Sequence, residues 1–163
     1  MSKTMRTLFA LIAFMAFFSC NSNAQKAEPK EETFEVTKTD AEWKAQLSPE
    51  QYYVLRQAGT ERPFSSTLNK EYSEGVFHCA ACDTPLFKSE HKFDSGTGWP
   101  SFDREIEGNV SYSVDYNLGY ARTEEHCATC GGHLGHVFND GPRQTTGKRH
   151  CINGVALKFV PKS

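Results

Sequence analysis

The sequence predicts a mainly β protein, in which an antiparallel β domain follows a short helical N-terminal arm. Several short stretches are rich in β-branched and aromatic residues and are separated by Gly, Asn, Asp or Pro, a pattern typical of antiparallel strands. These stretches are 75–79 (GVFHC), 110–116 (VSYSVDY), 118–127 (LGYARTEEHC) and 154–160 (GVALKFV). The chain of 163 residues is 23% charged and 38% apolar, which fits one soluble globular domain with a tail.

Residues 1–19 have the pattern of a secretory signal peptide. Lys3 and Arg6 precede an uncharged apolar run that is too short to span a bilayer as a helix. Ser19 and Cys20 follow, and a cysteine at this place resembles the bacterial lipoprotein signal, in which the new N-terminal cysteine is acylated. We therefore expect a lipid on Cys20 that anchors the protein in the bacterial cell envelope, facing the periplasm. The alternative is an ordinary signal peptide in which Cys20 has no role.

The stretch 20–38 is polar and rich in Glu and Lys, with too few apolar side chains to form a core. It predicts a flexible tether, so the folded domain is expected to span 39–163.

Two short helices are expected at the start of the domain. Asp40 is expected to cap the first helix. Ser48, Pro49 and Gln51 supply the second with an N-cap, a first-turn proline and a reciprocal capping partner. Gly59 is expected to end it.

The clearest strand is 110–116. Its regular alternation predicts that Val110, Tyr112 and Val114 lie on one side.

Two C-x-x-C pairs can together supply four thiolates to one tetrahedral zinc ion. They are Cys79 with Cys82 and Cys127 with Cys130. Gly131 follows the second pair, where a tight knuckle needs a positive φ. Because four thiolates leave no open coordination position, such a site is structural.

Three alternatives exist for these cysteines. In an oxidising compartment both pairs could be disulfides. One pair could be a redox C-x-x-C, although the βαβ setting typical of that motif is missing. Finally, His133 and His136 could join Cys127 and Cys130 as ligands, which would leave the first pair without partners.

Cys151 is the cysteine that belongs to neither pair nor to the leader. Reactive cysteines need positive charge nearby, and Lys148, Arg149 and His150 precede this one. A regular strand over 149–159 would put Arg149, Cys151, Asn153, Val155, Leu157 and Phe159 on one face. The alternative is a small buried residue of a core strand.

Two more stretches carry candidate site residues. Trp99 and Phe102 lie in a Gly- and Pro-rich stretch, where an aromatic side chain either lines a site or fills the core. His133 and His136 precede Asp140, and histidine suits proton delivery near neutral pH. Each histidine could instead be a surface or structural residue.

Five stretches together resemble the B-type methionine-R-sulfoxide reductases. They are GTERPF, FHCAACDTPLF, KFDSGTGWPSF, CATCGGHLGHVFNDGP and RHCINGVALKF, in this order between about Trp43 and Phe159. The resemblance implies two antiparallel β-sheets and one structural zinc ion on the four paired cysteines. It also implies thiol-dependent reduction of the R epimer of methionine sulfoxide in proteins, which repairs oxidised proteins.

The resemblance also implies roles for individual residues. Cys151 matches the nucleophile, whose thiolate attacks the sulfoxide sulfur and becomes a sulfenic acid. His136 matches the acid that protonates the oxygen, with His133 as its helper and Asp140 orienting both. Trp99 matches the aromatic wall that holds the methyl group.

Three further residues complete the implied site, and one departs from the family pattern. Arg149 and Asn153 are expected to polarise the oxygen or support the thiolate, and Phe102 to join the substrate wall. Many family members carry a resolving cysteine where this sequence has Thr97. We therefore expect an external thiol, from a thioredoxin-like protein or a small molecule, to reduce Cys151 directly.

Two other functions remain open from the residues alone: a zinc-stabilised binding module without activity, and a general thiol–disulfide oxidoreductase. The expected partners are oxidised proteins, a thiol reductant and, through Cys20, a membrane. The net charge of −2 gives no reason to expect nucleic acid. A monomer is expected.

Overall fold

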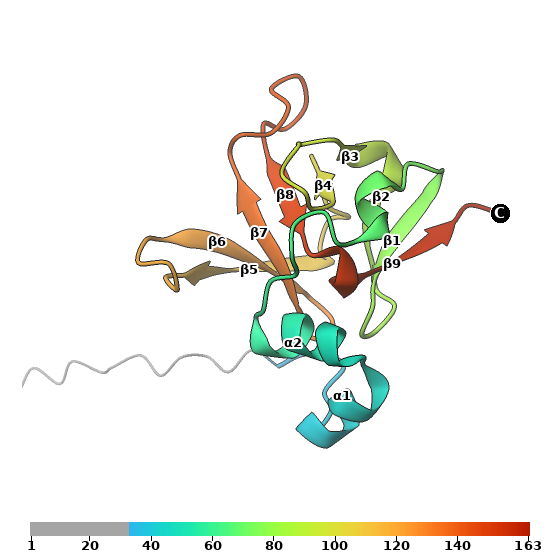
Figure 1. Cartoon of the computed structure of the whole chain (residues 1–163), viewed down its shortest axis with the longest axis vertical. Helices are drawn as coiled ribbons and strands as arrows, with labels where there is room; N and C mark the ends of the chain where they lie inside the picture. The colour runs from blue at the N-terminus through green and yellow to red at the C-terminus, as the bar shows by residue number, and fades with distance from the viewer. Residues whose placement is uncertain (1–32) are drawn as a thin grey trace, which may run out of the picture. The chain divides into compact units, whose positions relative to one another are not determined.

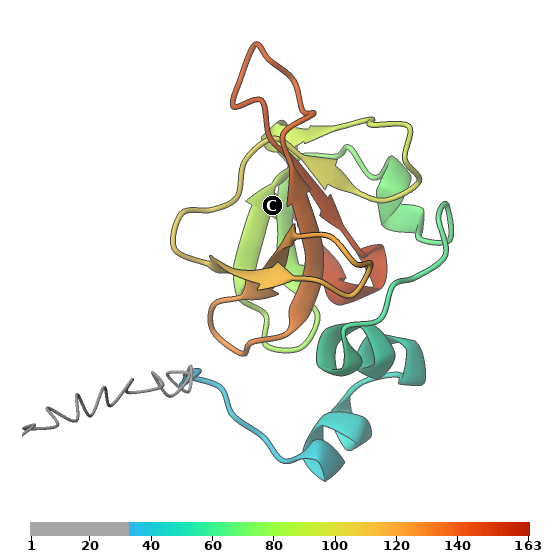
Figure 2. The ribbon, with the colours of Figure 1, turned by 90° about the vertical axis from the view of Figure 1, so that its left-hand side faces the viewer.

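The computed structural model describes residues 33–163, so the predicted signal peptide, Cys20 and most of the predicted tether lie outside the described residues. The described part is mainly β, as predicted, with two helices and two antiparallel sheets (Figures 1 and 2). No helix among these residues is long and apolar enough to cross a membrane.

The first helix, α1 (Asp40–Gln46), begins at Asp40 itself, whereas Asp40 was predicted to be the N-cap residue before the helix. Thr39, not Asp40, is the N-cap, because Thr39 and Glu42 form a reciprocal capping box. Asp40 instead lies in the first turn, where its carboxylate pairs with Lys44 at 2.7 Å.

The second helix, α2 (Pro49–Gln57), has the predicted capping box between Ser48 and Gln51. Its end differs from the prediction, since Ala58 rather than Gly59 adopts the left-handed conformation, at φ 52°. A Cβ at Gly59 would overlap the ring of Tyr53, so a larger residue there would require this half-exposed side chain to move.

The strands form two sheets in which every pairing is antiparallel. The three-stranded sheet has the order β2 (Pro85–Lys88), β1 (Gly75–Cys79), β9 (Leu157–Pro161). The six-stranded sheet has the order β3 (Lys92–Phe93), β4 (Ser101–Phe102), β8 (Arg149–Ile152), β7 (His133–Phe138), β6 (Arg122–Cys127), β5 (Val110–Asp115). Short 3-10 turns are η1 (Thr67–Lys70), η2 (Ser89–His91) and η3 (Gly154–Ala156).

Aromatic rings fill the core, and Phe102, which was predicted to line the substrate site, is one of them. Phe102 is fully buried, stacks on Phe87 with ring centroids 4.4 Å apart, and meets Phe77 edge-on at 5.0 Å. Its ring therefore packs the core and takes no part in a substrate wall. Strand alternation explains this placement, because Phe102 pairs with the buried His150 while Ser101 pairs with Cys151.

The predicted regular strand over 149–159 is wrong, because the chain changes sheets within it. β8 belongs to the six-stranded sheet and β9 to the three-stranded sheet, with η3 between them. The Glu61 carboxylate accepts hydrogen bonds from the backbone N–H groups of Gly154 (2.7 Å) and Val155 (2.8 Å). These bonds satisfy backbone groups that leave the sheet ladder at this crossing.

The side of β5 that carries Val110, Tyr112 and Val114 is buried only at its first residue. Val110 is buried, but Tyr112 and Val114 are 40% and 62% exposed. The β5–β6 hairpin extends beyond the rest of the domain (Figure 1), so its outer half has no layer to pack against.

The packed domain begins earlier than residue 39. The backbone N–H of Val36 donates to the carbonyl of Thr129 at 2.9 Å, and Val36 packs against the core. Gly131 has the predicted positive φ, at 67°, and a Cβ there would overlap the ring of Phe34. The end of the predicted tether thus lies on the turn that carries the second cysteine pair.

Candidate active site and cysteine cluster

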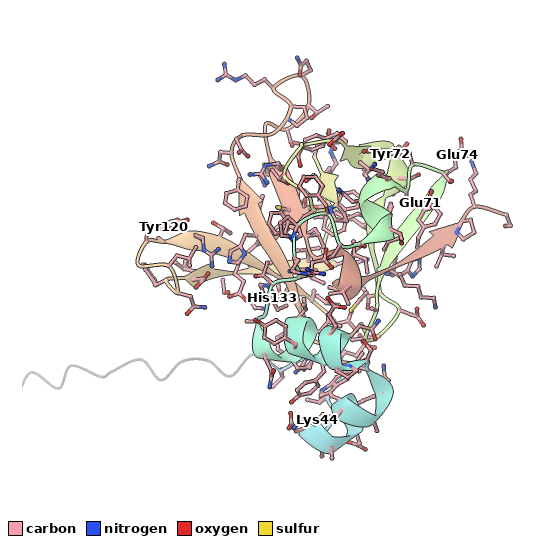
Figure 3. All side chains as sticks on the ribbon, in the orientation of Figure 1. Lys44, Glu71, Tyr72, Glu74, Tyr120 and His133 are labelled. Atoms are coloured by element: carbon pink, nitrogen blue, oxygen red, sulfur yellow. The ribbon has the colours of Figure 1, made fainter. Side chains whose placement is uncertain are left out.

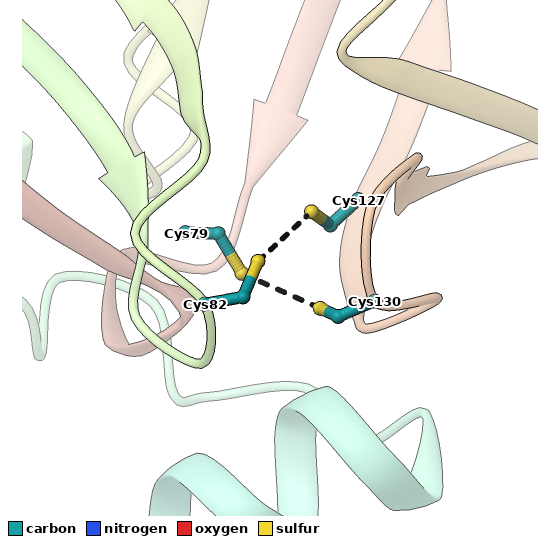
Figure 4. Close-up of side chains that lie close together, drawn as sticks. All are labelled: Cys79, Cys82, Cys127 and Cys130. Carbon is teal, nitrogen blue, oxygen red and sulfur yellow. Dashed lines mark hydrogen bonds between the residues drawn. The ribbon is translucent and has the colours of Figure 1, made fainter. Parts of the chain in front are cut away.

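The four paired cysteines meet between the two sheets. Cys79 ends β1 and Cys82 lies in the turn after it, while Cys127 ends β6 and Cys130 lies in the turn before β7. Their sulfur atoms all lie within 4.8 Å of one another, and Figure 4 shows them converging. The cluster therefore draws its donors from both sheets.

The sulfur spacing fits a metal ion, and all four cysteines are free thiols in this structure. The Sγ atoms are 3.8 Å apart for Cys79 and Cys130, and 3.5 Å apart for Cys82 and Cys127. A disulfide needs about 2.05 Å. Four thiolates held tetrahedrally at about 2.3 Å from a zinc ion are about 3.8 Å apart. The cluster thus fits a tetrahedral metal ion, and no histidine belongs to it.

Cys151 lies on β8, at a cavity of about 150 Å³. The residues that line this cavity are Thr60, Trp99, Arg122, Gly135, His136, Phe138, Cys151 and Asn153. A larger hollow, of about 710 Å³, lies beside β1 and β9, but no cysteine lines it. The smaller cavity is therefore the candidate active site, because it combines a thiol with proton donors.

One of the three predicted cations acts on the Cys151 thiol. His150 points to the opposite face of β8, where it is fully buried and its Nδ1 lies 2.6 Å from the Glu125 carboxylate. Lys148 is exposed. Burial raises the pKa of the Cys151 thiol above its ordinary value, while the Arg149 guanidinium and the Thr97 hydroxyl, 3.9 Å from Sγ, oppose this increase.

The predicted role of Asp140 is wrong. Its carboxylate accepts two hydrogen bonds from Arg149, both at 2.9 Å, and it makes no hydrogen bond to either histidine. Arg149 also lies over the ring of Phe138, 4.5 Å from its centroid. Asp140 and Phe138 therefore fix the guanidinium beside Cys151, which makes Asp140 a positioning residue for Arg149.

Two carboxylates that the sequence did not indicate hold the histidines. Asp115 Oδ2 lies 2.9 Å from His136 Nε2 and also binds Arg122. The backbone N–H of Asn117, together with His136 and Arg122, lowers the pKa of Asp115 to about 2. Since Asp115 is ionised at neutral pH, His136 Nε2 must be the donor in this bond.

The second histidine is a buried neighbour of the first. His133 Nδ1 lies 2.5 Å from Glu124 Oε1, and its ring centroid lies 5.6 Å from that of His136. Burial lowers the pKa of His133, which favours the neutral ring. His133 does not line the cavity, so its effect on a substrate acts through His136.

Asn153 lines the cavity, but its amide is held by the backbone. Its Oδ1 accepts from the N–H of Glu61 at 3.0 Å, and its Nδ2 donates to the carbonyl of Leu134 at 2.9 Å. The Trp99 indole N–H donates to the carbonyl of Glu61 at 3.2 Å. Glu61 thus positions both residues, a role that only its place in the GTERPF stretch could have suggested.

We expect Arg149→Gln to shift the reactivity of Cys151 to higher pH. The guanidinium opposes the effect of burial, so its removal raises the thiol pKa and lowers the thiolate fraction at any given pH near neutrality. Iodoacetamide alkylation of Cys151 across a pH series measures this shift. Asp140→Asn is the matched control, since it keeps the guanidinium charge and should shift the profile less. Coincident profiles for the wild type and Arg149→Gln would show that Arg149 does not act on the thiol.

The fold and the site define a β protein with a four-cysteine cluster of metal-binding geometry and a separate cavity thiol beside a histidine and an arginine. The SelR domain model matches residues 47–161. A peptide methionine sulfoxide reductase MsrB of Agrobacterium fabrum is 53% identical over 127 residues, which cover 77% of this chain and 93% of the relative. An MsrB of Pseudomonas syringae is 54% identical over 129 residues, which cover 78% and 98%. The chain belongs to the SelR-domain family, together with these MsrB proteins.

Proposed function

We propose that this protein reduces the R epimer of methionine sulfoxide in oxidised proteins, with Cys151 as the nucleophile. The observation that carries the proposal is the position of Cys151, which among residues 33–163 is the one cysteine outside the cluster and which lines a cavity with His136 and Trp99. Membership of the SelR-domain family supports the reaction class. The protein would then repair methionine residues that oxidation has made polar.

The reaction transfers one oxygen atom from the substrate to Cys151. The thiolate attacks the sulfoxide sulfur while His136 donates a proton to the oxygen, which gains negative charge as the S–O bond weakens. The products are the thioether of methionine and the sulfenic acid of Cys151, so methionine gains two electrons and the cysteine loses two. Asp115 holds the His136 imidazole in place through its bond to Nε2.

Epimer selection follows if the methyl group and the oxygen have separate places in the cavity. Trp99 and His136 both line it, and the Trp99 ring is fixed through its N–H. We infer that the methyl group packs on Trp99 and the oxygen faces His136. The S epimer would then exchange these two groups, so that the oxygen contacts the indole and gains no proton.

Thr97 determines how the sulfenic acid is removed. Its Oγ1 lies 3.9 Å from Cys151 Sγ, so a residue at this position reaches the reacting sulfur, but threonine cannot form a disulfide. Without a resolving cysteine, an external thiol condenses with the sulfenic acid and releases water, and a second thiol then restores Cys151.

We expect Thr97→Cys to divert recycling through an intramolecular disulfide. One equivalent of substrate without reductant should yield a disulfide between Cys151 and the introduced cysteine in this variant, whereas the wild type should yield a sulfenic acid that dimedone traps. Mass spectrometry of the digested protein distinguishes the two products. Thr97→Ser is the control, because it keeps a hydroxyl and should behave as the wild type. A disulfide between Cys151 and a cluster cysteine in the wild type would contradict direct reduction.

We also propose that the cluster holds one structural zinc ion. The cluster offers four thiolates from two C-x-x-C turns, and three of the four cysteines are buried. This donor set and spacing match those of structural zinc sites. When bound, the ion supplies cross-linking rather than chemistry, since its four thiolate ligands leave no open position.

The test of the proposed function uses residues 20–163 without acylation, separate R and S forms of dabsyl-methionine sulfoxide, and dithiothreitol. Turnover of the R form alone supports the proposal. Reduction of insulin disulfides instead would indicate a general oxidoreductase, and no turnover would indicate a binding module. Acylation of Cys20 is a separate proposal, checked by membrane fractionation of cells that express the full chain or Cys20→Ala.

A further inference from the structure

We propose that the free edge of strand β5 pairs with the same edge of a second copy of this chain, so that the protein forms a weak, reversible dimer. β5 (Val110–Asp115) ends one side of the six-stranded sheet, where it pairs with β6 and, among residues 33–163, with no other strand. An unpaired strand edge presents a row of backbone donors and acceptors to another chain. The proposal replaces the monomer that was expected from the sequence.

β5 is the one sheet edge of the described chain that lacks protection against such pairing. The two sheets have four edge strands, which are β2, β9, β3 and β5. Proline, lysine and short length protect edges in natural sheets. β2 and β9 each carry both a proline and a lysine, and β3 has only two residues, one of which is a lysine. β5 has six residues, none of them proline or lysine, and its single charged residue, Asp115, already binds His136 and Arg122.

The register of the β5–β6 hairpin assigns the backbone groups that face the free edge. The N–H of Ala128 donates to the carbonyl of Asn109 at 3.0 Å, a bond that flanks the facing pair of Val110 and Cys127. In an antiparallel ladder, a pair flanked in this way exchanges no hydrogen bonds, and the two kinds of pair alternate along the strand. The residues whose N–H and C=O groups point away from β6 are therefore Val110, Tyr112 and Val114.

The sequence of this edge is the same in both directions, which makes it self-complementary. Residues 110–114 read Val-Ser-Tyr-Ser-Val, so an antiparallel copy centred on Tyr112 places each residue beside one of its own kind. Val110 of each copy then faces Val114 of the other, and the two Tyr112 residues face each other. Each of these pairs joins outward-facing backbone groups and exchanges two hydrogen bonds. Facing aromatic and β-branched side chains stabilise such a pairing further.

Charge and area together decide how strong this pairing is. Like charges that face each other destabilise a pair of strands, and this register has none, because residues 109–114 carry no charge and Asp115 would face Asn109 of the other copy. A paired stretch over 109–115 would be about 24 Å long and roughly 12 Å deep, and so would bury on the order of 600 Å² over the two copies. Stable complexes bury about 1,200–2,000 Å². We therefore expect a dimer that dissociates on dilution.

The edge is accessible, and the pairing leaves both Cys151 cavities open. Tyr112 and Val114 are exposed, and Figure 3 shows Tyr120 at the outer end of the same hairpin, away from the body of the domain. His136 and Cys151 face each other across β7 and β8, on one face of the sheet. The two-fold axis of the pairing is perpendicular to the sheet, so both copies present this face on the same side.

Sedimentation equilibrium of the mature chain, residues 20–163, tests the proposal over a range of loading concentrations under reducing conditions. The average mass of the wild type should rise with concentration from that of one copy toward that of two. Val114→Lys places a charge on the edge and should raise the dissociation constant at least about tenfold. Val160→Lys is the matched control, because Val160 is exposed on β9, the edge of the other sheet, and it should keep the wild-type constant. Thermal melts show whether each variant folds.

Cross-linking tests the register. The background is Cys20→Ser with Cys151→Ser, which leaves only the four cysteines of the cluster. Tyr112→Cys should form a disulfide-linked dimer with oxidised glutathione, because facing Cα atoms of a hydrogen-bonded pair are about 5.5 Å apart, a distance that suits a disulfide. Ser113→Cys should form none, since the introduced thiol would face Ser111 of the other copy.

Three results would overturn the proposal. The first is a wild type whose mass stays that of one copy at every concentration. The second is a dimer that Val114→Lys does not weaken, or that Val160→Lys weakens as much, since another surface would then join the copies. The third is a disulfide-linked dimer of Ser113→Cys without one of Tyr112→Cys, since the strands would then not be centred on Tyr112. None of these results depends on whether the protein reduces methionine sulfoxide.

Discussion

Replacing Cys151 with serine should abolish sulfoxide reduction and leave the fold intact. A serine hydroxyl is far less nucleophilic than a thiolate and cannot accept oxygen as a sulfenic acid, so kcat should fall at least about a thousandfold. The side chain lies at the cavity and outside the cysteine cluster, so the free energy of unfolding should change by less than about 1 kcal/mol. Chromatography of dabsyl-methionine measures the first effect and urea unfolding the second.

The matched comparison for this variant is the same substitution within the cluster. Cys82→Ser changes one half-buried thiol to a hydroxyl, as Cys151→Ser does, but it should lower metal content and stability. If Cys151→Ser retained activity near that of the wild type, Cys151 would have no part in the reaction. If it also lost metal, the two sites would not be independent.

The sequence predicted best those features that depend on short spacing. The two C-x-x-C pairs, the capping box of Ser48 and Gln51, and the positive φ of Gly131 all arise within a few residues, and the structure confirms each. The meeting of the two cysteine pairs depends on the contact between two sheets. The spacing of the cysteines left open whether the two pairs share one site, and the family resemblance predicted that they do.

The errors in the predicted site have one common cause, which is strand register. Asp140 is near the histidines in sequence, but Phe138 pairs with Arg149 across β7 and β8, so Asp140 emerges beside the guanidinium. Asp115 reaches His136 because the β5–β6 hairpin pairs Asp115 with Arg122, and a single sequence does not fix that register. Alternation along β8 likewise turns His150 away from the thiol beside it.

Removing the metal should cost more stability than any substitution in the cavity. A structural site contributes its binding free energy to folding, on the order of 10 kcal/mol in small zinc domains. Whole domains are stable by only about 5–15 kcal/mol. We therefore expect Cys127→Ser, or prolonged treatment with a chelator, to remove most of the free energy of unfolding. Elemental analysis should give one zinc ion per wild-type chain, and urea unfolding with and without chelator measures the loss.

The position of the cluster explains why this loss should spread through the domain. Cys79 ends a strand of the three-stranded sheet and Cys127 ends a strand of the six-stranded sheet, so an ion bound by the cluster would join the two sheets beside the aromatic core. Without the ion, four thiolates within 4.8 Å of one another would repel, and they would have to take up protons or move apart. Loss of the ion should therefore separate the sheets before it disturbs Cys151, whose strand lies within the six-stranded sheet. Active wild-type protein without zinc, or with two disulfides among these four cysteines, would contradict both the metal and the role given to it here.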